Sequence, residues 1–341
     1  MSNNNHLKNI AIVGAGGNSG SFMAQSLIDT GRFTVTAITR PESTSKLPAG
    51  IKVAKASTND HDALVSALRG QDALIITLSV TAAAETHGQL VRAAADAGVP
   101  WVLPNDWGFD TTIDEVVNDI PGASKGPKGR RDVLDTGVSS YISVTTGFWY
   151  EWSLSIPSAY GFDFASKTVD FCDDGETKIS ISTWPQVGRA VAALMSLPIK
   201  PEGGNTERCL ENFRNKIVYV NSFTVSQKDM LDSVFRVTGD KVEDWTIVKK
   251  PARERHAAAA VALQGGERMA YVRVMYTRIF YDDGNGDFET RKGTSNKLLE
   301  LPEESLDEAT LRAVQRAEVS QAAFARLVEE RLEQEKKGVA L

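Results

Sequence analysis

The chain has 341 residues, 42% hydrophobic and 24% charged, a composition typical of a globular protein with one large or two modest domains. Its formal net charge of −6 lacks the basic excess that binding to a phosphate backbone requires, so we expect no nucleic-acid partner. Cys172 and Cys209 form no CxxC pair and stand apart from the histidines, which argues against a disulfide scaffold and predicts no metal site. The polar start of the chain has no signal-peptide core, and no apolar run is long enough to span a bilayer. We therefore expect a cytoplasmic protein without a membrane partner.

The first half of the chain alternates strand-like and helix-like segments. The strand-like segments, apolar or β-branched, lie at 10–13, 33–39, 51–54, 72–78, 101–103 and 141–145. The helix-like segments, most of them stopped by a glycine, lie at 19–29, 60–69, 86–97 and 127–135. Because buried strands separated by helices pair in parallel, this order predicts an α/β fold, a doubly wound parallel sheet of the Rossmann type.

The pattern changes after Gly147. Thr183 and Pro185 begin a helix, a strand follows at 216–220, and Ser226 opens another helix with Asp229 in a capping box. Further helical segments are expected at 252–263, 267–281 and 307–337. We interpret the second half as a smaller, mainly helical C-terminal substrate lobe. The expected division is a Rossmann domain of residues 7–150 plus 184–222, and a cap lobe of residues 151–183 plus 223–341.

The glycine-rich segment between the first strand and the first helix predicts a dinucleotide site. Gly14, Gly17 and Gly20 stand where a tight turn, a close approach to pyrophosphate and close helix–strand packing each need a residue without a side chain. The helix N-terminus then offers N–H groups and a partial positive charge to the phosphates. The predicted cofactor-binding residues are Gly14, Gly16, Gly17, Asn18, Ser19, Gly20, Arg40, Lys46, Leu78 and Ser79.

The end of the second strand indicates NADP(H) as the cofactor. An acidic residue at this point selects NAD, whereas an arginine accommodates the 2′-phosphate of NADP. The strand ends at Arg40, 20 residues beyond Gly20, with no Asp or Glu at its tip. Lys46 adds positive charge to the following loop, and Glu42 weakens the preference.

Several motifs together resemble those of the NmrA-like and isoflavone-reductase-like atypical short-chain dehydrogenases. They comprise the glycine loop, Arg40, the segments 94–100 and 104–108, Arg130-Arg131, Gly137, and the segments 146–148 and 184–198. The resemblance covers roughly residues 10–231 and implies a Rossmann fold with NADP(H).

The resemblance also implies a lysine, on the helix with the paired arginines, in place of the Tyr-x-x-x-Lys pair that this sequence lacks. Counting back from Gly137 places it at Gly126, between Lys125 and Lys128. With Pro127 starting the helix, Lys128 would fall in the first turn and Lys125 in the preceding loop. Lys125 and Lys128 are the candidate catalytic residues; the alternative is that both are solvated loop lysines. His87, near the expected nicotinamide position, is interpreted as a helix-surface residue.

Aromatic residues cluster after the fifth and sixth strands. The candidate substrate-binding residues are Trp107, Phe148, Trp149, Tyr150 and Trp152, although a core that joins the two lobes explains the same pattern. The leading hypothesis is an NADPH-dependent reductase of a small hydrophobic or aromatic carbonyl or alkene. The alternatives are a dinucleotide-sensing regulatory protein without turnover, and a non-redox isomerase, lyase or cyclase. The sequence does not indicate an oligomeric state.

Overall fold

The computed structural model describes residues 5–79, 82–83, 85–203 and 206–319, which form two compact units. The first unit comprises Met1–Phe148, Ser180–Ser222 and Gly286–Glu303, and the second comprises Trp149–Ile179, Phe223–Asn285 and Glu304–Leu341. The segment 286–303, expected in the cap lobe, is therefore assigned to the first unit. Its Ser295 N–H donates to the Tyr219 carbonyl at 2.8 Å, and the Asn296 side chain donates to the Asn221 carbonyl at 2.8 Å.

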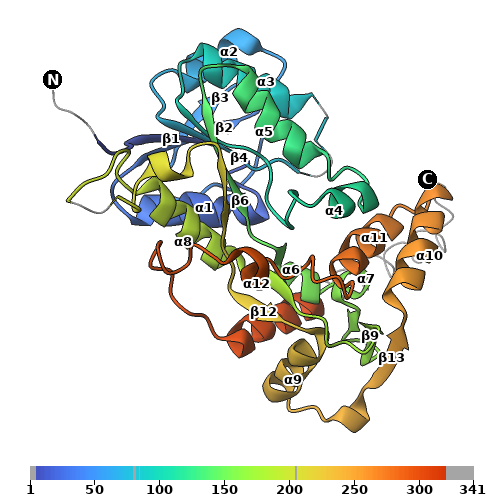
Figure 1. The fold of residues 1–341 in the computed structure, drawn as a ribbon. Helices are drawn as coiled ribbons and strands as arrows, with labels where there is room; N and C mark the ends of the chain where they lie inside the picture. Colours follow the sequence, from blue (N-terminus) through green and yellow to red (C-terminus); the bar gives the residue numbers. More distant parts are fainter. Residues whose placement is uncertain (1–4, 80–81, 84, 204–205, 320–341) are drawn as a thin grey trace, which may run out of the picture. The chain divides into compact units, whose positions relative to one another are not determined.

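A seven-stranded sheet forms the centre of the first unit, in the order β11-β6-β5-β4-β1-β2-β3 (Figure 1). The strands are β1 (Asn9–Val13), β2 (Thr34–Thr39), β3 (Lys52–Lys55), β4 (Ala73–Ile76), β5 (Trp101–Leu103), β6 (Ser140–Thr145) and β11 (Lys216–Tyr219). All the neighbouring pairs are parallel. The first strand, β1, lies inside the sheet. β2 and β3 follow on one side of it, and β4, β5, β6 and β11 follow on the other side. The predicted Rossmann-like fold is confirmed.

Helices cover both faces of this sheet. On one face, α1 (Asn18–Asp29) packs against α8 (Trp184–Met195); on the other lie α2 (His61–Leu68), α3 (Thr86–Asp96) and α5 (Lys125–Asp135) (Figure 1). Apolar side chains from these three helices and the sheet form one buried cluster. It includes Leu64 and Leu68 of α2, Leu90 and Val91 of α3, and Val133 of α5, all at most 1% exposed. Burial of this face fixes where α3 and α5 begin, and therefore the position of the groups near their first turns.

The second unit contains helices and one small sheet. Its helices are α6 (Tyr150–Leu154), α7 (Pro157–Tyr160), α9 (Gln227–Thr238), α10 (Ala252–Gln264) and α11 (Ala270–Ile279), and residues 306–319 are also helical. The capping box of Ser226 and Asp229 is present at the start of α9, as predicted. A sheet in the order β13-β9-β8, from Thr246–Lys250, Thr168–Cys172 and Phe162–Asp163, was not predicted. The part of the predicted C-terminal helix beyond residue 319 lies outside the described residues.

The remaining elements are short. In the first unit α4 (Asp114–Asp119) follows β5, η1 (Leu210–Phe213) precedes β11, and α12 (Phe288–Lys292) follows α11 along the chain. The strands β7 (Phe148–Trp149), β10 (Ile179–Ser182) and β12 (Phe223–Val225) and the turn η2 (Val242–Asp244) complete the described elements. In the described part of the chain, no helix has the combination of length and apolar character needed to cross a bilayer.

Candidate functional site

The loop after β1 rests directly on the end of β4. Gly14 has φ of +88°, and a Cβ at this position would lie 2.0 Å from the Thr77 carbonyl oxygen. Thr77 itself donates from its N–H and from its Oγ1 to the Val13 carbonyl, both at 2.9 Å. Gly20 also has no room for a side chain, because a Cβ at this position would lie 2.2 Å from the Gly14 carbonyl oxygen. Only glycine fits at either position, so the loop, the strand end and α1 are locked together.

The N-terminus of α1 has the features of an anion-binding site. Gly17 is its N-cap, with extended backbone, and no side chain among the described residues accepts a hydrogen bond there. The first turn, which contains Asn18 and Ser19, has no acidic residue. The free N–H groups and the positive end of the helix dipole therefore face no competing carboxylate. A phosphate is the ligand such an end attracts.

A cleft of about 520 Å³ runs from this loop to the ends of β2 and β4. It lies where the chain order of the sheet reverses, which is the usual ligand site of an open α/β sheet, and its volume is in the range of ligand pockets. The lining includes six of the ten predicted cofactor-binding residues: Gly14, Gly16, Gly17, Arg40, Leu78 and Ser79. Of the other four, Asn18 and Ser19 begin α1, Gly20 packs on Gly14, and Lys46 is exposed with its carbonyl behind Gly16.

Arg40 provides a cation at the far end of the cleft. Its side chain is 70% exposed, and its Nε lies 3.5 Å from Oε1 of Glu42, a long contact between two exposed groups. Ser43 and Ser45 lie on the same wall. A guanidinium with nearby hydroxyls suits a phosphate dianion, because the planar fork donates to two oxygens at once. The cleft therefore fits a phosphorylated dinucleotide. The glycines and the N-terminus of α1 suit the pyrophosphate, and Arg40 suits a second phosphate group at the other end.

A smaller cavity of about 60 Å³ adjoins the cleft and shares four lining residues with it: Leu78, Ser79, Ala82 and Ala83. Lys125 and Lys128 line this cavity, so the structure brings the two candidate catalytic residues together. The prediction that Lys125 lies in a loop is wrong, because α5 begins at Lys125 rather than at Pro127. Proline is accommodated in the first turn, where a backbone N–H has no partner inside the helix.

Lys128 is engaged by a neighbouring carboxylate. Its Nζ lies 2.7 Å and 2.8 Å from the two carboxylate oxygens of Asp132, one turn further along α5, and its side chain is 67% exposed. The same Asp132 faces His87 on α3, with 3.7 Å between Oδ2 and Nδ1. Asp132 is thus shared between the two bases.

His87 was interpreted as a helix-surface residue, and this interpretation is wrong. Its side chain is only 15% exposed and lines the 60 Å³ cavity. Burial lowers the pKa of His87 below its ordinary value, and the opposing attraction of Asp132 does not offset it. The helical periodicity of α3 does not indicate that His87 is buried, because the ring is covered by α5, which is distant in sequence.

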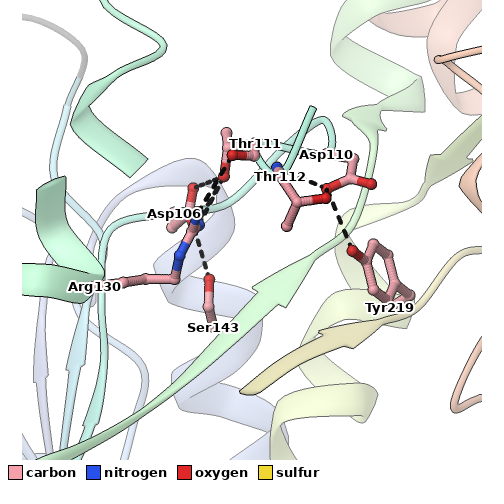
Figure 2. A network of polar contacts seen from close by, with 7 residues as sticks. All are labelled: Asp106, Asp110, Thr111, Thr112, Arg130, Ser143 and Tyr219. Carbon is pink, nitrogen blue, oxygen red and sulfur yellow. Dashed lines mark hydrogen bonds and ion pairs between the residues drawn. The ribbon is translucent and has the colours of Figure 1, made fainter. Parts of the chain in front are cut away.

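The position that the family resemblance assigns to a lysine is closed in this structure. A Cβ on Gly126 would lie 2.2 Å from Oδ1 of Asp106. Figure 2 shows why Asp106 is fixed: the buried carboxylate pairs with Arg130 and accepts hydrogen bonds from Ser143 at 2.7 Å and Thr111 at 3.1 Å. A polar network therefore occupies the space that a side chain at position 126 would need.

A second part of Figure 2 lies at the end of β11, where the Tyr219 hydroxyl donates to Oδ1 of Asp110 at 3.3 Å. Burial, together with the charge of Asp110, raises the pKa of Tyr219 to about 12. Tyr219 therefore remains protonated near neutral pH. The residues of Figure 2 come from the loop between β5 and α4, from β6 and β11, and, for Arg130, from α5.

The candidate substrate-binding residues fall in both units. In the first, Trp107 is half-buried and donates from Nε1 to the Ile76 carbonyl at 2.8 Å, and Phe148 packs edge-on against Phe109. Trp149, Tyr150 and Trp152 belong to the second unit. Tyr150 is fully buried there, with its hydroxyl 2.7 Å from Oγ1 of Thr310, whereas Trp152 is partly exposed and stacks on Tyr276. In the second unit Tyr150 therefore has the environment of a core residue.

The chain is similar to several characterised proteins. A family model, the NmrA-like family, matches residues 6–143. Oxidoreductase aprR of Aspergillus flavus is 26% identical over 309 residues, covering 88% of this chain and 96% of that protein. A solved structure of the pinoresinol-lariciresinol and phenylcoumaran benzylic ether reductases has a TM-score of 0.70 and 21% identity, covering 90% of this chain and 99% of that one. The NADPH-dependent quinone oxidoreductase QOR2 of Escherichia coli has a TM-score of 0.62 and 20% identity, covering 88% and 98%. The resemblance predicted from the motifs is thus confirmed: residues 6–143 match the NmrA-like family model, and the fold is similar to that of these reductases.

Proposed function

We propose that this protein is an NADPH-dependent oxidoreductase that reduces a small hydrophobic or aromatic carbonyl or alkene. The observation that carries the proposal is the 520 Å³ cleft, which joins the glycine loop and the start of α1 to Arg40. Similarity to aprR, named an oxidoreductase, and to the NADPH-dependent QOR2 supports the same reaction class.

Each part of the cofactor has a partner in the first unit. The N–H groups around Gly17 would hold the pyrophosphate, and Arg40 with Ser43 and Ser45 would hold the 2′-phosphate. Leu78 and Ser79 would then lie beside the nicotinamide, because they line both the cleft and the smaller cavity. The bound cofactor supplies a hydride, and the protein must orient the acceptor and provide a proton.

The substrate class is proposed from the aromatic residues and the relatives. Trp107 and Phe148 lie on the segments that follow β5 and β6, at the carboxyl edge of the sheet where ligands of this fold bind. QOR2 is named a quinone oxidoreductase, and another structure of similar fold is of pinoresinol-lariciresinol and phenylcoumaran benzylic ether reductases. Flat aromatic surfaces suit such acceptors through stacking and buried area.

Calorimetric titration with NADPH and NADH tests the cofactor assignment. We expect tighter binding of NADPH in the native protein, and loss of that preference in Arg40→Glu. Arg69→Glu is the matched control, because Arg69 is an exposed arginine at the end of α2 that does not line the cleft. A native preference for NADH, or no binding of either dinucleotide, would refute the assignment.

Loss of nicotinamide absorbance with menadione, cyclohexenone and acetophenone as trial acceptors tests the reaction. We expect NADPH oxidation with at least one of them by the folded, cofactor-bound protein. The absence of turnover across a wider panel of ketones, enones and quinones would count against a reductase.

One observation favours a second function, dinucleotide sensing without turnover. The position expected to carry the lysine is Gly126, and Asp106 leaves no room there for a side chain. A sensor would bind NADP⁺ and NADPH with clearly different affinities and oxidise neither the trial acceptors nor any other carbonyl compound. Equal affinities for the two redox states would remove the basis for sensing.

A further inference from the structure

His87, Asp132 and Lys128 form a polar cluster between two helices of the first unit. His87 is the second residue of α3, and Lys128 and Asp132 lie on consecutive turns of α5. Glycine allows the helices to approach here: a Cβ on Gly129 would lie only 3.1 Å from Cε1 of the His87 ring. The cluster is therefore part of the packing between α3 and α5, and its geometry is set by the buried core beneath it.

The ring of His87 has hydrogen-bonding capacity that the described residues do not use. Both ring nitrogens are buried and have no hydrogen-bond partner within the described residues, and the 3.7 Å to Asp132 is too long for a hydrogen bond. Buried polar atoms are nearly always satisfied, and exceptions mark ordered water or a working group. The adjoining cavity of about 60 Å³ is polar on the side of His87 and Asn105 and has room for a few waters.

Among the candidate proton donors of this unit, His87 has the surroundings that the chemistry requires. Lys128 is largely exposed and held by Asp132, and Lys125 is exposed on the first turn of α5. Gly126 provides no side chain. His87 is shielded from bulk solvent, yet its cavity shares Leu78 and Ser79 with the dinucleotide cleft.

We propose that His87 donates the proton of the reduction, through a water in the 60 Å³ cavity, with the nearby carboxylate of Asp132 stabilising its imidazolium form. This inference rests on the proposed function. As hydride adds to the carbonyl carbon, the electron pair of the C=O bond moves to oxygen, which takes a proton from the bridging water. That water is reprotonated by the imidazolium of His87, which becomes neutral and regains its proton from solvent. A histidine acting through one water is a common arrangement for general acids.

The charges around His87 determine its response to pH. Asp132 and Asp106 favour its protonated form, and Lys128 disfavours it. Lys125 lines the same cavity, and Arg92 on α3 lies near Gly88, the next residue along the helix. Because NADP⁺ carries a positive nicotinamide ring that NADPH lacks, binding of NADP⁺ should oppose protonation of His87. By linkage, acid should then weaken NADP⁺ more than NADPH.

The test is the ratio of the dissociation constants of NADP⁺ and NADPH, measured by fluorescence titration as a function of pH. The 2′-phosphate is common to both ligands, so its own titration cancels in the ratio. We expect the ratio to rise about threefold between about pH 7.5 and pH 5, because protonated His87 opposes the positive nicotinamide ring of NADP⁺ but not the neutral ring of NADPH. In His87→Gln the ratio should be independent of pH.

His61→Gln is the matched control, because His61 also faces a carboxylate, with Nε2 2.8 Å from Oδ2 of Asp96, but lines neither cavity. It should keep the native pH dependence. Should His87→Gln not fold, heteronuclear NMR of the native protein gives the same answer: NADP⁺ should lower the titration midpoint of His87 relative to NADPH.

A flat native ratio, or a His87→Gln variant that retains the native pH dependence, would overturn this inference while leaving the proposed function intact. Failure of the protein to bind either dinucleotide would overturn both. With an active acceptor, His87→Gln should lower kcat about a hundredfold or more, the usual contribution of a general acid, whereas an equal loss in Lys128→Met alone would assign the proton to the lysine instead.

Discussion

Replacement of Gly126 by alanine should destabilise the protein, although the same replacement stabilises most helices. Alanine in place of glycine inside a helix normally stabilises it by about 1 kcal/mol. Here the added Cβ would lie 2.2 Å from Oδ1 of Asp106, so one of the two groups must shift. The buried carboxylate would have to move, and its bonds to Arg130 and Ser143 would weaken. Overpacking of this kind costs about 1 to 3 kcal/mol, so we expect a net loss of stability.

Urea unfolding followed by circular dichroism measures the change, and Gly88→Ala is the control. Gly88 is also helical, but its nearest neighbour is the mobile end of Arg92, at 3.2 Å, so the general rule should hold there. A double-mutant cycle sharpens the result: in an Asp106→Ala background, the cost of Gly126→Ala should largely disappear. A Gly126→Ala protein as stable as the native one would refute our description of the network.

Three further outcomes follow from the described contacts. Arg40→Ala should raise the dissociation constant of NADPH about tenfold or more, because a charge-assisted hydrogen bond to phosphate contributes about 1.5–3 kcal/mol. The dissociation constant of NADH should stay nearly unchanged, and calorimetry measures both constants. Asp106→Ala should lower the free energy of unfolding by about 3 to 5 kcal/mol, because it leaves the buried Arg130 guanidinium without its ion-pair partner. Glu300→Ala, which breaks an exposed ion pair with Arg208, should lower it by less than about 1 kcal/mol. Since the folded protein holds the pKa of His87 below its ordinary value near 6.5, the unfolded chain binds more protons just below that pH. Stability should therefore fall as the pH drops through that window, and His87→Gln should reduce this slope in pH-dependent thermal unfolding; an unchanged slope would contradict it.

The parts of the fold that the sequence predicted are those with strong local signals. Most strands of the large sheet are apolar or β-branched runs, and the start of α9 has a capping box that acts over three residues. The strands of the small sheet in the second unit are harder to predict. β13 begins with three β-branched residues, but four of its five residues, Thr246–Lys250, are exposed, and its partner β9 is more than seventy residues away in sequence, so the pairing is a tertiary feature.

The candidate site divides in the same way. The glycine loop and Arg40 could be predicted because a strand, a turn and a helix N-terminus follow one another in sequence. The network around Asp106 could not, since Arg130 lies 24 residues away and no periodicity links them. His87 was missed for the same reason: the ring is buried by Gly129 of α5, and a glycine that permits close packing resembles any other glycine in a sequence.

The interleaved segments of the first unit affect how this protein can be made and divided. Its sheet receives its last strand, β11, only at residues 216–219, and the helix α8 that packs on α1 is at 184–195. During synthesis, therefore, the first unit stays incomplete until well past the middle of the chain, with the apolar side of α1 uncovered until α8 has emerged. A fragment ending at residue 148 would lack both elements, so expression of the NmrA-like segment alone should yield an aggregation-prone product rather than a cofactor-binding domain.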